Sequence, residues 1–149
     1  MGNLSHEVMC LRFFGDDLDP RKLSRQLGVQ ASYGWRKGEL WSNRGVGDLR
    51  TTGGWVLNGD WVRLGDINNQ IADLFQSLAQ DLSLWETLTA SLYADVFCGL
   101  FLEQANGRAL LSPVSMKLLS ARGLPLSMEI YEREQGRARG LQDWGVERP

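Results

Sequence analysis

The side chains that could do chemistry are few, and the single histidine limits what they can do. His6 lies close to the start of the chain, where domains commonly fray. A catalytic triad needs a nucleophile, a base and an orienting group, and zinc sites commonly use histidine ligands. One terminal histidine argues against both kinds of site. We therefore assign no catalytic residues and expect no cofactor.

Other reactive groups have simpler interpretations. Asp16, Asp17 and Asp19 are close enough to hold a divalent cation, but the remaining ligands of a calcium loop are missing and Asp19 suits a helix cap. No metal site is predicted. Cys10 and Cys98 each lie in an apolar run, which favours packed thiols and a reducing compartment. The glycine pairs lack the spacing of phosphate-binding loops.

A first candidate surface lies on the predicted open face of a sheet. Alternation along three strands places charged and aromatic side chains on the side away from the helices. They are Arg12, Asp95, Phe97, Phe101, Glu129 and Tyr131. Two interpretations stand: an amphipathic face on which Arg12 pairs with Asp95 or Glu129, or a surface for a ligand or partner.

A second candidate surface lies where the start of the first helix approaches two glycine-rich segments. Opposite charges beside tryptophan rings suit recognition of a polar group. The residues are Asp16, Asp17, Trp35, Arg36, Lys37 and Trp55. In the alternative interpretation, Trp35 and Trp55 pack at the end of the core and Arg36 pairs locally with Asp16 or Asp17.

The elements that position these residues follow from hydrophobic periodicity and from helix caps. Alternating apolar residues predict strands over 7–14, 31–37, 54–58, 93–103 and 126–131. Caps and stripes predict helices over 20–27, 66–82 with a continuation through Trp85 and Leu88, and from Pro113 to before Gly123. Asn106-Gly107 predicts a hairpin with a returning strand over 108–111. The polar stretch 42–50 is expected to be mobile.

This order of elements indicates an α+β fold, in which an antiparallel sheet carries three helices mainly on one face. Its first six elements follow the ferredoxin-like βαββαβ order, which a further β-α-β extends. The strand over 7–14 then pairs antiparallel with that over 93–103, and the helix over 66–82 covers the face of Leu11 and Val96. Cys10 and Cys98 fall on opposite faces, so they cannot form a disulfide.

Composition sets the class of protein. The 149 residues suit one domain over 1–132, followed by a charged tail over 133–149. The net charge of −2 argues against nucleic acid as a partner. No apolar run is long enough to span a bilayer, and the N-terminus lacks the apolar core of a signal peptide. We therefore expect a cytoplasmic protein without a membrane partner.

Five sequence blocks, in order, resemble a known family. They are Phe13 to Pro20, Trp35-Arg36-Lys37-Gly38, Thr52-Gly53-Gly54-Trp55, Asp95 to Phe101, and Leu111-Ser112-Pro113. Together they look like the bacterial domain of unknown function 4279 (DUF4279), over about Glu7 to Tyr131. The resemblance implies that this is a short bacterial protein from a family whose members mostly stand alone. It supplies no activity and no catalytic residues that could be transferred to this chain. It is weakest after Glu39 and beyond Glu132.

Two functions follow as hypotheses. The first is a non-enzymatic binding or interaction domain with a protein partner, for example in an immunity-like or mobile-element accessory role, because aromatic and charged residues gather without a catalytic set. The alternative is a small enzyme, or a binder of a small molecule bearing a carboxylate or phosphate, in a pocket of Trp, Arg and Asp. Homodimerisation through Phe97, Phe101 and Tyr131 is a further expectation.

Overall fold

The computed structural model describes residues 4–40, 49–59, 66–102 and 107–132. Its strands are β1 (Leu4–Gly15), β2 (Tyr33–Trp35), β3 (Gly53–Asn58), β4 (Tyr93–Leu102) and β5 (Leu126–Tyr131). Its helices are α1 (Pro20–Leu27), α2 (Ile67–Gln76), α3 (Leu82–Ser91) and α4 (Pro113–Ala121). The mixed α+β class predicted from the sequence is confirmed.

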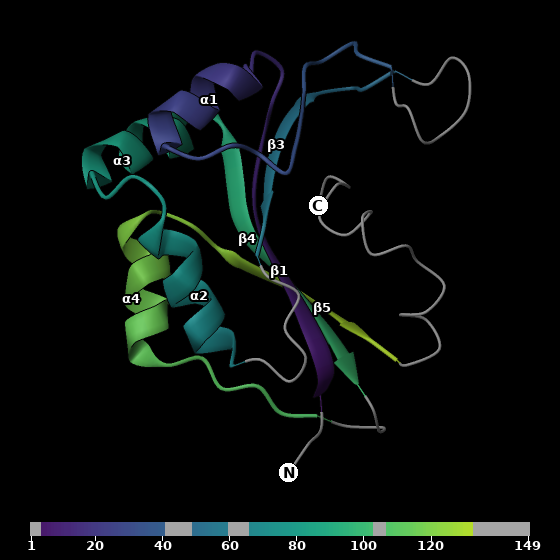
Figure 1. Cartoon of the computed structure of the whole chain (residues 1–149), viewed down its shortest axis with the longest axis vertical. Helices are drawn as coiled ribbons and strands as arrows, with labels where there is room; N and C mark the ends of the chain where they lie inside the picture. The colour runs from purple at the N-terminus through teal and green to yellow at the C-terminus, as the bar shows by residue number, and fades with distance from the viewer. Residues whose placement is uncertain (1–3, 41–48, 60–65, 103–106, 133–149) are drawn as a thin grey trace.

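The five strands form one sheet in the order β2-β3-β1-β4-β5. Neighbours are antiparallel except for β4 and β5, which are parallel. The helices of the described residues lie together on one face of this sheet, as Figure 1 shows. The opposite face carries no helix from the described part of the chain.

The main core lies between the sheet and the helices, as the parity of the strands requires. In β1 and β4, Leu11 faces Val96 across the ladder and both are fully buried. Ile71 and Phe75 of α2 and Trp85 of α3 pack into the same cluster. The predicted antiparallel pairing of β1 with β4, and the face that α2 covers, are both confirmed.

The single helix expected over 66–82 is wrong: two helices, α2 and α3, stand in its place. The hydrophobic stripe continues through the break, since Leu78 is buried between them. Side chains satisfy the backbone there: Gln80 Nε2 donates to the carbonyls of Phe75 and Leu78, and Asp81 caps α3 by accepting from the Ser83 N–H. Hydrophobic periodicity indicated which residues are buried. It could not show that α2 ends at Gln76 and that α3 begins at Leu82.

The strand expected over 108–111 is absent, because residues 107–112 form no strand. The Asn68 side chain bonds this segment to α2, donating to the Leu110 carbonyl and accepting from the Ser112 N–H, both at 2.8 Å. The place beside β4 is taken by β5, which runs parallel to it. A parallel neighbour needs a crossover connection, and α4 lies on that connection. The hairpin residue Asn106 lies outside the described residues.

Two further expectations concern parts of the chain that are not fully described. Most of the polar stretch 42–50 and the whole tail over 133–149 lie outside the described residues. Within the described residues, no helix is long and apolar enough to cross a membrane.

Cys10 and Cys98 are both buried and unlinked, as predicted, and they belong to clusters on opposite faces of the sheet.

Candidate functional site

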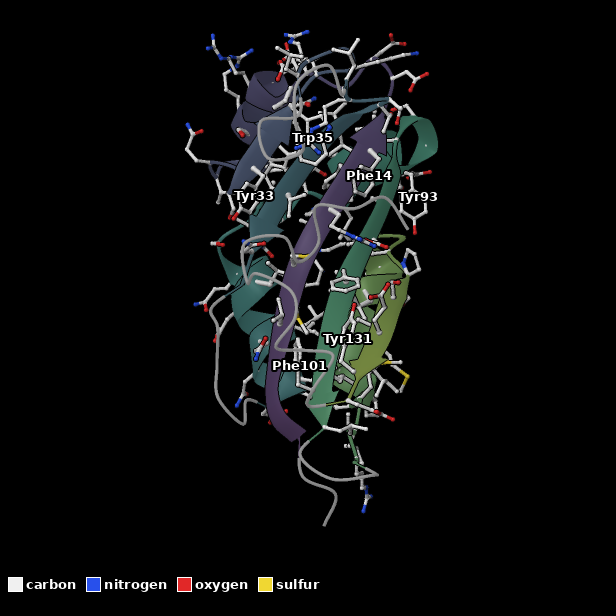
Figure 2. All side chains as sticks on the ribbon, turned by 90° about the vertical axis from the view of Figure 1, so that its right-hand side faces the viewer. Phe14, Tyr33, Trp35, Tyr93, Phe101 and Tyr131 are labelled. Atoms are coloured by element: carbon white, nitrogen blue, oxygen red, sulfur yellow. The ribbon has the colours of Figure 1, made fainter. Side chains whose placement is uncertain are left out.

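The face of the sheet opposite the helices carries most of the first candidate surface. We call this surface the aromatic face, and Figure 2 views it directly. Its side chains are Val8, Cys10, Arg12, Phe14, Tyr33, Trp35, Val56, Tyr93, Asp95, Phe97, Phe101 and Tyr131. Strand alternation brings them together from all five strands, because residues two apart share a face.

A buried ion pair lies at the middle of the aromatic face. Arg12 and Asp95 are directly opposite in the β1–β4 ladder, and their side chains are 3% and 0% exposed. Arg12 Nε donates to Asp95 Oδ1 at 2.8 Å and Nη2 donates to Oδ2 at 2.6 Å, while the Tyr93 hydroxyl donates to Oδ2 at 3.0 Å. Of the two partners proposed for Arg12, the structure selects Asp95. Glu129 is exposed.

Asp95 raises the pKa values of both Arg12 and Tyr93. Desolvation works to lower the pKa of Arg12, but the hydrogen bond and the charge of Asp95 outweigh it, so the pKa rises. Desolvation and the Asp95 charge raise the pKa of Tyr93. The Arg12 guanidinium also lies 4.6 Å from the Phe97 ring centroid, a cation–π distance. Arg12 is therefore a fixed part of a packed cluster.

The other rings of this face are largely withdrawn from water. Phe101 stacks on Tyr131 with centroids 5.2 Å apart, and Phe97 and Phe101 are only 4% and 1% exposed. Homodimerisation was expected because these rings lacked a covering helix. The single chain already buries two of them, so that reason is weakened, and the homodimer stays a prediction.

The second candidate surface takes a different form from the one expected. Two exposed ion pairs join the segment after β2 to the turn between β1 and α1. Arg36 Nη2 lies 2.8 Å from Asp19 Oδ2, and Lys37 Nζ lies 3.1 Å from Asp16 Oδ2. Arg36 therefore pairs with Asp19, not with the neighbouring Asp16 or Asp17. We call Asp16, Asp17, Asp19, Lys22, Arg36 and Lys37 the charged end.

Asp19 has two roles at the charged end. Its Oδ1 caps α1 by accepting from the Arg21 and Lys22 N–H groups, and its Oδ2 faces Arg36. Desolvation alone would raise the pKa of Asp19, but the Lys22 N–H and the Arg36 charge outweigh it and lower this pKa. The same carboxylate thus begins a helix and anchors the segment after β2.

A groove of about 330 Å³ opens beside the charged end, between α1, α3 and the β1–α1 turn. Its charged lining residues are Asp16, Asp17, Asp19 and Lys22. Thr87 and Ser91 of α3 add hydroxyl groups on the other side. Neither tryptophan of the predicted site is among its lining residues.

Trp35 and Trp55 lie on opposite faces of the sheet, so they do not line one surface. Trp55 is fully buried under α1, where its indole N–H donates to Ser24 Oγ at 2.9 Å. Trp35 belongs to the aromatic face and lies over Gly54, where any Cβ would overlap its indole ring. Gly54 is therefore needed for the close packing of β3 against Trp35.

Sequence reasoning missed three residues that organise these surfaces. Tyr93 shares the parity of Asp95, so strand alternation could have placed it beside the ion pair. Asp19 was recognised only as a cap. Arg50 lies 4.0 Å over the Trp35 ring, and this contact crosses a long connection for which the sequence gives no signal.

Two properties of the described residues bear on metal binding and on nucleophilic chemistry. These residues contain no group of three or more metal-binding side chains. Burial raises the pKa of the Cys10 thiol to about 12, so this thiol is protonated at neutral pH and is a poor nucleophile.

Fold and surfaces together define a mixed α+β domain, built on one sheet with helices on one face and a charged end. The chain belongs to the family described as a domain of unknown function, DUF4279, whose model matches residues 5–133. No curated protein and no solved structure matches it. The resemblance noted in the sequence blocks is thereby confirmed.

Proposed function

We propose that this chain is a non-enzymatic binding domain that contacts a protein partner through its charged end. One observation carries the proposal: charged side chains from two separate segments, 16–22 and 36–37, meet beside a groove, and they remain largely exposed. In the two ion pairs, the side chains of Arg36 and Asp19 are 57% and 32% exposed, and those of Lys37 and Asp16 are 53% and 61% exposed.

The exposure of these charges supports a binding role over a structural one. Exposed ion pairs contribute little to stability, with a median of about 0–1 kcal/mol. A partner that offers its own charges can therefore exchange with Asp16, Asp19, Arg36 and Lys37 at low cost. Mixed charges at the rim of an interface favour correct partners and fast association.

The groove supports a protein partner better than a small anion. Three of its four charged lining residues are aspartates, which would repel a carboxylate or a phosphate. Arg36, the residue expected to bind such a group, already faces Asp19. An immunity-like or accessory role is one concrete form of the proposal and stays a prediction.

Two finer interpretations belong with this proposal. The order β2-β3-β1-β4, with β1 between β3 and β4, supports a ferredoxin-like arrangement of the first four strands. The buried, unlinked thiols Cys10 and Cys98 support a cytoplasmic location, where disulfides are rare.

Affinity capture from a lysate of the encoding organism tests the function. The full chain is compared with an Arg36→Ala/Lys37→Ala variant and with an Arg21→Ala/Arg25→Ala control. The control removes the same charge from α1, which lies beside another groove. Proteins captured by the full chain and the control but lost with the first variant support the charged end. Equal capture by all three chains would contradict it, and mass spectrometry of small molecules in the same eluate checks the alternative.

A further inference from the structure

A second groove, remote in sequence from the charged end, lies between the end of β3 and α2. Its volume is about 200 Å³, and its walls include Leu57 of β3 and Leu74 of α2. Both leucines also pack against the main core, so this wall of the groove is fixed by the fold. Gln70 and Asp73 of α2 supply polar groups to the lining.

Gln70 is the unusual residue of this groove. It is only 9% exposed, and neither Nε2 nor Oε1 has a hydrogen-bond partner among the described residues. Buried side-chain amides in proteins normally have partners, because an unsatisfied donor or acceptor is costly. The backbone of Gln70 is held in the first turns of α2, since its N–H donates to the Asp66 carbonyl at 3.0 Å.

Asp73 adds a negative charge to the same side of the helix. Residues three apart on a helix are neighbours, so Asp73 follows Gln70 along the groove. It is exposed, and within the described part of the chain it forms no ion pair. The groove thus combines an apolar wall, a buried amide and a carboxylate at its rim.

We propose that this groove binds a small amphipathic amine with an oxygen on the neighbouring carbon, such as an amino alcohol. The ammonium group bonds to the Asp73 carboxylate and to Gln70 Oε1. The neighbouring oxygen accepts from Gln70 Nε2, which satisfies the second buried amide atom. A short branched alkyl group contacts Leu57 and Leu74. This site does not depend on the function proposed for the charged end.

Three probes of similar size separate these contacts in an NMR titration of the ¹⁵N-labelled full chain. Leucinol carries the ammonium, the hydroxyl and the alkyl group, isopentylamine lacks the hydroxyl, and isocaproate replaces the cation by an anion. Leucinol should give saturable shifts at the Gln70 side-chain amide and at Asp73 and Leu74. Isopentylamine should bind about tenfold more weakly, because one hydrogen bond to a buried group is lost. Isocaproate should not bind.

Variants assign the contacts to residues. In Gln70→Leu, leucinol and isopentylamine should bind equally, and Asp73→Asn should weaken both amines. Gln70→Met keeps the approximate size of the side chain, removes its N–H donor and its oxygen, and should give the same equal binding if the leucine variant does not fold. Asn69→Leu and Glu86→Gln, at exposed positions of α2 and α3, are matched controls that should leave both affinities unchanged.

The proposal is overturned if leucinol shifts are not saturable or do not centre on Gln70. It is equally overturned if the wild-type chain does not distinguish leucinol from isopentylamine, or if that preference survives in both Gln70 variants.

Discussion

The aromatic face and the charged end both contain ion pairs, but they place them in opposite surroundings. Arg12 and Asp95 are 3% and 0% exposed and lie among aromatic rings, whereas Arg36 and Lys37 pair with aspartates in contact with water. A buried pair cannot open without leaving a charge in an apolar cluster. An exposed pair opens at little cost. Separating the charges of the aromatic face is therefore costly, whereas separating those of the charged end costs little, as the proposed contact with a partner requires.

The largest effect is expected from breaking the buried pair. Arg12→Met should lower the free energy of unfolding by about 3–5 kcal/mol, because Asp95 then stays buried without its cation. Urea denaturation followed by circular dichroism measures this change. Arg36→Met makes the same substitution in an exposed pair and should cost less than about 1 kcal/mol.

The double variant Arg12→Met/Asp95→Leu refines this test. Replacing both charges by apolar groups is often neutral or stabilising, so most of the loss should be regained. The comparison of the two regions fails if Arg12→Met destabilises no more than Arg36→Met.

A smaller effect is expected from the third member of the buried network. Tyr93→Phe removes the hydroxyl that donates to Asp95 and should lower the free energy of unfolding by about 1 kcal/mol. Tyr33→Phe is the control on the same face, because the Tyr33 hydroxyl has no hydrogen bond within the described residues. Equal stabilities of the two variants in thermal unfolding would remove Tyr93 from the network.

At the charged end, stability should hardly respond to substitution. Arg36→Ala/Lys37→Ala should lower the free energy of unfolding by about 1 kcal/mol or less, and salt should reduce even this difference. Chemical denaturation in low and high sodium chloride measures it. A loss of several kcal/mol that persists in high salt would mean that these residues hold the fold together and are not free for a partner.

The sequence predicted the faces of the sheet better than its connections. Strand alternation alone placed Leu11 and Val96 under the helices and put Arg12 and Asp95 together on the other side. It could not tell that β5 runs parallel to β4, because alternation is the same in both directions. Nor could it find the break after α2, since a buried Leu78 continues the stripe that a longer helix would show.

The same difference holds for the candidate sites: residues on strand faces could be predicted, whereas contacts between loops could not. The aromatic face could be predicted because its residues lie on regular strands with known parity. The charged end required knowledge of which loops meet. The sequence analysis placed the segment of Arg36 near the start of the first helix, but it predicted the wrong partner for Arg36. Trp55 was grouped with Trp35 because both lie beside glycines, although strand parity places them on opposite faces. Gln70 gave no signal, because an amide within an amphipathic helix is unremarkable until its burial is known.

The smallest effect concerns the pH response of the charged end. The pKa of Asp19 is lowered in the folded chain, against its desolvation, by the Lys22 N–H and by Arg36. The stabilisation from its carboxylate is therefore fully present above the pKa of the unfolded chain, about 3.9, and is lost as pH falls through the lower folded pKa.

Asp19→Asn isolates this response, because asparagine still caps a helix but carries no charge. The stability difference between wild type and variant should be constant at neutral pH and shrink below about pH 5. Urea midpoints from pH 7 to pH 3 measure it, and a ¹³C NMR titration of the Asp19 carboxyl reports the pKa directly. Arg36→Ala should raise that pKa only part of the way to its ordinary value, because the cap hydrogen bonds remain. If Arg36→Ala leaves the titration midpoint of the Asp19 carboxyl unchanged, the cap alone lowers the pKa. The exposed pair with Arg36 would then have no measurable strength.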